Sequence, residues 1–233
     1  MGPGAWPASR LRSNRPVGSL IQAAMLKLQV IVGSIREGRH ADVVVRWLTP
    51  LAKAHGAFDV EVLDLRDWPL PFFQESIATV GDFKNPTYSQ PLVKKWNQKI
   101  AEGDAFLFVT PEYNHSIPGV LKNAIDSVFL SFGFRHKPAG MVGYSVGPAG
   151  GCRAVEHLAQ IGFEAEMHAL RDSVLIGQVH EAFGKDGAPV SPAQNAALKI
   201  TLDDLAWWGE LLKPARATQL PPGNFRLRAA LAR

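Results

Sequence analysis

The chain has 233 residues, of which 46% are hydrophobic, and a formal net charge of +4. This length fits one domain of ordinary globular composition with short appendages, and no apolar run approaches the roughly 20 residues that a membrane-spanning helix needs. Residues 1–26 carry three arginines and no acid, and residues 213–233 carry five cations and no acid, so the body between them has a net charge of −4. Nucleic-acid binding needs a basic face on the folded body, so we expect no nucleic-acid partner.

The two ends of the chain differ in composition from its middle. Residues 1–24 are rich in Gly, Pro, Arg and Ser and lack a hydrophobic period, which predicts a disordered extension. An Arg-rich, acid-free start is also typical of organellar transit peptides, and that alternative stays open. Residues 214–233 are predicted to form a basic tail, which leaves a folded domain over 25–213. The single cysteine, Cys152, excludes an internal disulfide and suits a reducing compartment, so we expect a cytoplasmic protein.

Strand and helix patterns alternate along the folded domain. Apolar or alternating runs predict five strands, at 26–32, 58–65, 104–109, 137–146 and 167–176. Helical spacing of apolar residues predicts five helices, near 44–52, 88–101, 119–129, 152–162 and 192–212, the last with Ser191 as N-cap. The stretch 66–90 has no clean period and is predicted to be mainly a long loop. This order predicts an α/β fold, with a parallel sheet, right-handed crossovers and helices on both faces.

Polar residues follow the third strand and precede the third helix. Pro111, Glu112, Tyr113 and Asn114 stand at this strand-to-helix junction. In open parallel sheets, ligands bind just outside the carboxyl ends of the strands. This loop is therefore predicted to be one wall of a ligand site, and the strand ends at Gly33 and Gly147 are expected to supply others.

The loop after the first strand has the residue types of a phosphate cradle. Ser34 offers a hydroxyl, Arg36 and Arg39 offer guanidinium forks, and the following helix start offers free N–H groups. The alternative is that two surface arginines merely solvate a helix start. The loop has neither the Walker pattern nor the G-x-G-x-x-G dinucleotide turn.

The glycine-rich loop from Gly147 to Gly151 also follows a strand. Its glycines would let backbone N–H groups approach a flat or anionic ligand, and a plain tight turn is an equally good interpretation. The seven histidines show no metal-ligand spacing, so no metal site is predicted. No catalytic side chain is assigned.

Three stretches resemble the NADPH-dependent FMN reductase family: GSIREGR after the first strand, PEYNHSIPGVLKNAID after the third, and KPAGMVGYSVGPAGGCRA through the fourth. The resemblance runs from about Met25 to Leu212. It implies a flavodoxin-like, doubly wound, five-stranded parallel sheet of order 2-1-3-4-5. It also implies non-covalent FMN held by three loops: Ser34, Arg36 and Arg39 at the phosphate; Pro111, Glu112, Tyr113 and Asn114 at the flavin edge; and Ser145, Gly147, Gly150 and Gly151 in a second flavin loop.

The resemblance also implies an activity. Family members pass reducing equivalents from NADPH or NADH to a small-molecule electron acceptor, such as a flavin, a quinone, an azo dye or a metal oxyanion, and we expect a ping-pong reaction. They are commonly homodimers or homotetramers. The alternative is an FMN-binding electron carrier that needs a separate reductase. Residues 135–137 could suit a phosphate of NADPH, and the apolar segment 128–134 could line an interface, line an acceptor pocket or pack in the core.

Overall fold

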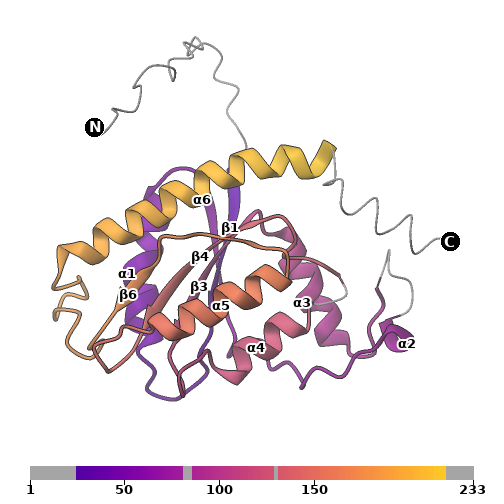
Figure 1. Cartoon of the computed structure of the whole chain (residues 1–233), viewed down its shortest axis with the longest axis horizontal. Coiled ribbons are helices and arrows are strands. Elements are labelled where there is room, and N and C mark those ends of the chain that lie inside the picture. Colours follow the sequence, from indigo (N-terminus) through magenta and orange to yellow (C-terminus); the bar gives the residue numbers. More distant parts are fainter. Residues whose placement is uncertain (1–24, 81–85, 129–130, 219–233) are drawn as a thin grey trace, which may run out of the picture.

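The computed structural model describes residues 25–80, 86–128 and 131–218 of the chain (Figure 1). The strands form one parallel sheet of order β2-β1-β3-β4-β5, and β6 also pairs with β4, so the expected flavodoxin-like order is confirmed. The strands are β1 (Leu26–Val32), β2 (Phe58–Asp64), β3 (Ala105–Pro111), β4 (Pro138–Tyr144), β5 (His168–Ala169) and β6 (Val174–Ile176). The helices are α1 (Ala41–Ala54), α2 (Ile77–Val80), α3 (Pro91–Glu102), α4 (Gly119–Asp126), α5 (Cys152–Glu164) and α6 (Pro192–Thr218).

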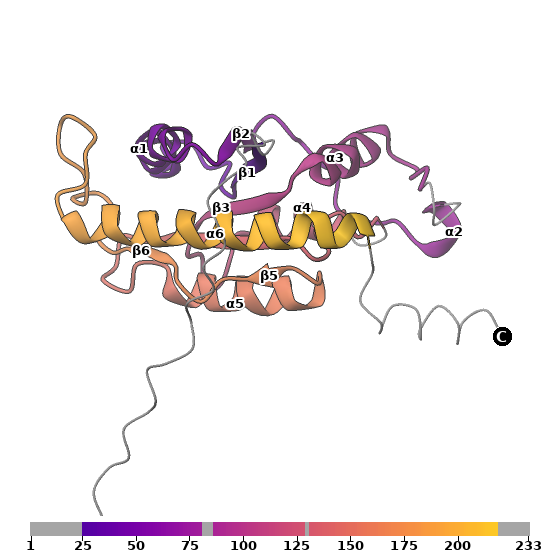
Figure 2. The same ribbon diagram turned by 90° about the horizontal axis from the view of Figure 1, so that it is seen from above.

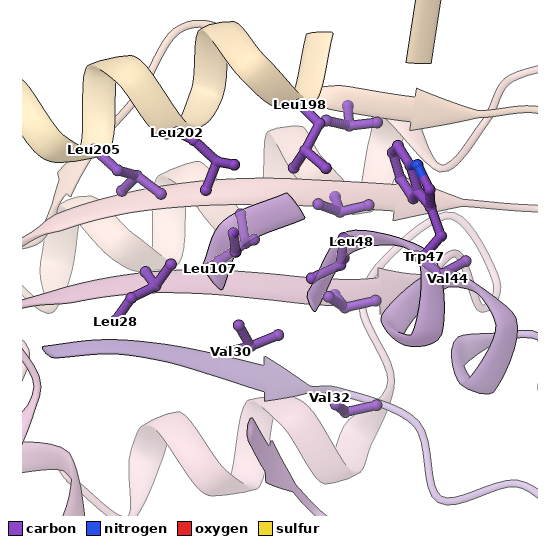
Figure 3. Packing of buried hydrophobic residues seen from close by; sticks show 14 of the residues in the cluster. Leu28, Val30, Val32, Val44, Trp47, Leu48, Leu107, Leu198, Leu202 and Leu205 are labelled. Carbon is purple, nitrogen blue, oxygen red and sulfur yellow. The ribbon is translucent and has the colours of Figure 1, made fainter. Parts of the chain in front are cut away.

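The sheet is covered on both faces, with α1 and α5 on opposite sides of the strands (Figure 2). Every residue of β3 and β4 is buried, because the central strands of a parallel sheet are covered by helices on each side. On one face, leucines of α6 and the apolar side of α1 pack over β1 and β3 (Figure 3). On the other, α3, α4 and α5 pack over the same strands, and this layer includes Val128 and Phe134. These two residues of segment 128–134 therefore belong to the core, whereas residues 129–130 lie outside the described part.

The single fifth strand expected over 167–176 is wrong in detail, because two short strands occupy this stretch. Ala169 pairs with Ala139, and Val174 pairs with Val142. Three residue positions along β4 are therefore matched by five along the β5–β6 stretch. The extra residues form a bulge between β5 and β6. The bulge falls on polar residues 171–173, which a buried parallel strand would not accommodate.

Helix α6 starts as expected and ends later than expected. The Ala193 N–H donates to Ser191 Oγ at 3.3 Å, which confirms the N-cap. The helix passes Leu212 and Pro214 and continues to Thr218. Its last turns are held by Asp104, which lies 2.7 Å from Lys213 Nζ and 3.2 Å from Arg216 Nη2. The predicted N-terminal extension, 1–24, and most of the predicted tail, 219–233, lie outside the described residues.

The stretch 66–90 contains more order than its pattern indicated. Helix α2 lies within it, and α3 begins at Pro91 rather than at Tyr88. Glu75 is buried and accepts hydrogen bonds from the Ser89 N–H at 2.9 Å and from Ser89 Oγ at 2.8 Å. Burial alone would raise the pKa of Glu75, but hydrogen bonds from Thr79 and Ser89 lower it below its usual value. One charged side chain therefore ties this segment to the start of α3.

Lys137 should make the stability of the fold depend on pH. Its side chain is buried, and Nζ donates to the Ala101 carbonyl at 3.1 Å, at the end of α3. Burial, aided by the positive charge of Arg216, lowers the pKa of Lys137 from 10.5 to about 7. The unfolded chain therefore binds more protons than the folded one between these two values. The free energy of unfolding is thus expected to rise with pH across this window by about 1 kcal/mol per pH unit.

Urea unfolding of wild type and Lys137→Met between about pH 7.5 and 9.5 checks this expectation. The variant should show a flatter dependence of unfolding free energy on pH. Lys122→Met is the matched control, because Lys122 is half-exposed and pairs with Asp126 on the same helix. A Lys137→Met protein that keeps the wild-type slope would contradict the assignment of the titration to this side chain.

Candidate functional site

A cleft of about 470 Å³ lies at the carboxyl ends of β1, β3 and β4. Its position is the one expected for a ligand site in an open parallel sheet, and its volume falls in the usual range for small-molecule sites. Three loops supply most of its lining: Arg36, Glu37, Gly38, Arg39 and His40 after β1; Pro111, Glu112 and Tyr113 at and after the end of β3; and Tyr144, Ser145, Val146 and Gly147 at and after the end of β4. Arg153 and Val179 complete it.

The loop after β1 carries one guanidinium that faces protein acceptors and one that does not. Arg39 is buried and pairs with both oxygens of Asp64, with Asp42 and with the Ser34 carbonyl. Hydrogen bonds to Asp64 raise the pKa of Arg39 above its usual value, so it stays charged. Arg39 thus lines the cleft while its N–H groups fasten the loop to β2 and α1. Within the described residues, the Arg36 guanidinium has no acceptor, so this fork is available to a ligand.

The start of α1 adds donors at the same end of the cleft. His40 is the N-cap residue and makes no side-chain capping hydrogen bond, so the first N–H groups of the helix lack that partner. Ser34 is buried and does not itself line the cleft, but its Oγ lies 3.1 Å from the hydroxyl of Tyr113, which does, and this contact joins the loop after β1 to the one after β3. This end of the cleft therefore combines a helix N-terminus, an unpaired arginine and a hydroxyl pair, a set suited to an anion.

The loop after β3 is a tight hairpin. The Tyr113 N–H donates to the Ser116 carbonyl at 2.8 Å, and the Ser116 N–H donates to the Tyr113 carbonyl at 3.1 Å. Asn114 and His115 between them have φ angles of 49° and 74°, the left-handed pair that a type I′ turn requires. Asn114 thus forms the tip of the turn and does not line the cleft, whereas Tyr113 and Glu112 do.

Glu112 presents an unsatisfied acceptor in the cleft wall. Its side chain is 6% exposed, and Oε1 accepts a hydrogen bond from Arg153 Nε at 2.6 Å. Its other oxygen, Oε2, is buried and has no hydrogen-bond partner among the described residues. A buried carboxylate oxygen without a donor is costly, so a ligand N–H or O–H is the natural partner at this point of the cleft.

The glycine-rich loop after β4 divides into two parts. Ser145 and Gly147 line the cleft, and Ser145 Oγ donates to the Gly147 carbonyl at 2.9 Å. Gly150 and Gly151 do not line it and have φ angles of 64° and 81°. They press against the backbones of β4 and β6, where a Cβ on Gly151 would lie 2.6 Å from the Tyr144 nitrogen. The close approach that these two glycines permit is therefore between chain segments.

The structure adds residues to the site and separates one predicted group from it. Tyr144 and Arg153 line the cleft but carried no distinguishing pattern, because one ends a buried strand and the other belongs to a helix start. Residues 135–137 precede β4, whereas the cleft lies beyond its far end, about 20 Å away at the usual rise per residue. They do not line the cleft, and their suggested role at an NADPH phosphate stays a prediction. Among the described residues, no three side chains gather as metal ligands would, and no helix is long and apolar enough to cross a membrane.

Comparison with known proteins shows which family this chain belongs to. A model of the family described as NADPH-dependent FMN reductase matches residues 26–181. An NAD(P)H-dependent FMN reductase of Schizosaccharomyces pombe is 34% identical over 67% of this chain and 80% of its own length. A second, from Pseudomonas aeruginosa, is 30% identical over 81% of this chain and 97% of its own length.

Solved structures agree with this placement. FerB, a flavoenzyme NAD(P)H:(acceptor) oxidoreductase from Paracoccus denitrificans, superposes with a TM-score of 0.66 at 26% identity, covering 81% of this chain and 99% of that protein. The resemblance seen in the three loop sequences is thus confirmed, and the chain belongs to the NADPH-dependent FMN reductase family of flavodoxin-like oxidoreductases.

Proposed function

We propose that the cleft binds FMN non-covalently and that the chain uses it to pass reducing equivalents from NADPH or NADH to a small acceptor. The observation that carries this proposal is the convergence of the three strand-end loops on one cleft of suitable size. Relatives named FMN reductase and quinone reductase support it.

The charges of the cleft fit the two ends of FMN. The phosphate would lie at the anion-suited end, near Ser34, Arg36 and the start of α1. Glu112, which carries an unpaired acceptor, would repel the phosphate and attract an N–H of the flavin ring. These opposite preferences would fix the direction in which FMN enters the cleft.

The protein groups would bind and orient, and bound FMN would supply the hydride and electron chemistry. Arg39 would hold the phosphate loop in shape through its acidic partners. Pro111, Glu112 and Tyr113 would wall the flavin on one side, and Ser145 and Gly147 on another. We assign no side chain as an obligatory acid or base. A single open face would then serve the nicotinamide and the acceptor in turn, which gives ping-pong kinetics.

We further propose a quinone, flavin or azo compound as acceptor, and a homodimer or homotetramer as the working form. A 2-hydroxy-1,4-benzoquinone reductase of a Burkholderia species, 35% identical over 78% of this chain, supports the quinone. Cytoplasmic placement is part of the same proposal, supported by the single, unpaired cysteine.

The first experiment is the visible spectrum of the purified protein, followed by chromatography of the released chromophore. We expect oxidised flavin bands, release of FMN, and bleaching of the bands by NADPH or NADH. Steady-state oxidation of the nicotinamide with a quinone panel should then give parallel double-reciprocal lines. A protein that holds FMN but is bleached only after a separate reductase is added would be a carrier instead. A protein that binds no added FMN would contradict the proposal.

A further inference from the structure

Tyr144 lines the cleft near the end suited to an anion, and its hydroxyl is buried there close to Ser34 and Tyr113. It is the last residue of β4, and its ring packs in the core layer beneath α1 and α6. The side chain is almost fully buried, with 3% of the residue exposed, yet it lines the cleft. A strand-end tyrosine of this kind has an apolar ring in the core and a polar tip at the ligand site.

The Tyr144 hydroxyl has no acceptor for its proton among the described residues. Burial raises the pKa of this hydroxyl above its usual value, and the neighbouring Tyr113 acts in the same direction, while a hydrogen bond from the Ser34 hydroxyl to the Tyr144 oxygen opposes it. The group therefore stays protonated and remains a donor. Buried tyrosine hydroxyls usually find an acceptor, so a vacant donor calls for one supplied by a ligand.

The surroundings of the hydroxyl indicate which acceptor it meets. Ser34 belongs to the loop after β1, and its hydroxyl is hydrogen-bonded to the Tyr113 hydroxyl. The unpaired Arg36 guanidinium and the uncapped start of α1 belong to the same end of the cleft. Glu112 pairs one carboxylate oxygen with Arg153 and keeps the other without a donor, as the proposed contact with the flavin ring requires. The acceptor most compatible with these neighbours is an anionic oxygen.

We propose that the Tyr144 hydroxyl donates a hydrogen bond to the phosphate of FMN and so helps the cleft to prefer FMN over riboflavin. This inference rests on the proposed function, because it assumes that FMN occupies the cleft. Tyr144 is not among the residues that the sequence analysis expects at FMN, so the proposal gives it a new role in ligand specificity. The hydroxyl would act on binding and would take no part in hydride transfer.

The test is a comparison of two ligands in two proteins. FMN and riboflavin are titrated into the flavin-free full chain, wild type and Tyr144→Phe, and the dissociation constants are measured by quenching of flavin fluorescence. Losing a hydrogen bond to a charged group should weaken FMN binding roughly 10- to 100-fold. Riboflavin, which lacks the phosphate, should bind both proteins with about equal affinity.

Tyr88→Phe is the matched control, since Tyr88 is also buried but its hydroxyl donates to Asn97 Oδ1 at 2.8 Å, away from the cleft. It should change neither dissociation constant. Equal weakening of both flavins by Tyr144→Phe would overturn the inference, because the hydroxyl would then contact a part that both share. Unchanged FMN binding would overturn it too. A wild-type chain that binds neither flavin would instead overturn the proposed function.

Discussion

Replacing Gly151 with alanine is expected to destabilise the fold by about 3 kcal/mol and to weaken flavin binding at the same time. Gly151 has a φ of 81°, which costs an L-residue roughly 1–2 kcal/mol. The added Cβ would also lie 2.6 Å from the Tyr144 nitrogen and 3.0 Å from the Gly143 carbonyl carbon. Both contacts are to backbone, so the start of α5 must move away from β4, and forced packing adds roughly another 1–3 kcal/mol.

Gly147→Ala is a control within the same loop. A Cβ on Gly147 would meet no atom within 4 Å, so the free energy of unfolding should change by less than about 1 kcal/mol. Urea unfolding of the two variants, each without flavin, measures the difference directly. If Gly151→Ala unfolds at the same urea concentration as Gly147→Ala, the expectation is contradicted, because close packing of this turn would then not require Gly151.

Replacing Arg39 with methionine is expected to cost about 2–3 kcal/mol of stability. The change leaves Asp64 without its paired guanidinium and the Ser34 carbonyl without its donor. Breaking a buried ion pair usually costs about 3–5 kcal/mol, and the partial exposure of Asp64 lowers this figure. Because the loop after β1 loses its fastening, FMN affinity should fall as well.

The pH dependence of stability in Arg39→Met tests whether Asp64 is the ion-pair partner of Arg39. Burial alone would raise the pKa of Asp64, but hydrogen bonds from Arg39 and the Arg66 amide lower it below 3.8. The stability that this pair contributes is therefore present above the unfolded pKa and is lost as pH falls through the folded one. Arg39→Met should accordingly lose less stability than wild type on acidification below about pH 4. Arg66→Met, at a more exposed arginine, should keep the wild-type acid sensitivity.

Local patterns were enough to predict most of the fold. The apolar run 26–32 has the same bounds as β1, and the glycines before Cys152 correctly predict where α5 begins. Such features are decided by neighbours in sequence and by burial between two helix layers. The three loops were located for the same reason, because each directly follows a buried strand.

Features that depend on distant partners were beyond sequence reasoning. Two arginines in one loop look alike, but Asp64 and Asp42 engage Arg39 and leave Arg36 without an acceptor. Glu75 orders a segment with no helical or strand period by accepting hydrogen bonds from residues 14 and 15 positions away. Gly150 and Gly151 were expected to let the backbone approach a ligand, but they pack closely against the backbone of neighbouring strands.

The ion pairs that hold the end of α6 decide where this chain can be joined to another. A tag or reporter attached after Lys213, where the following proline suggests a boundary, would remove Arg216 from its contacts with Asp104 and with the His136 carbonyl. Asp104 directly precedes β3 and also accepts a hydrogen bond from the Lys27 N–H of β1. Such a fusion would therefore cut into the folded body, whereas a junction placed after Thr218 keeps both cations in place.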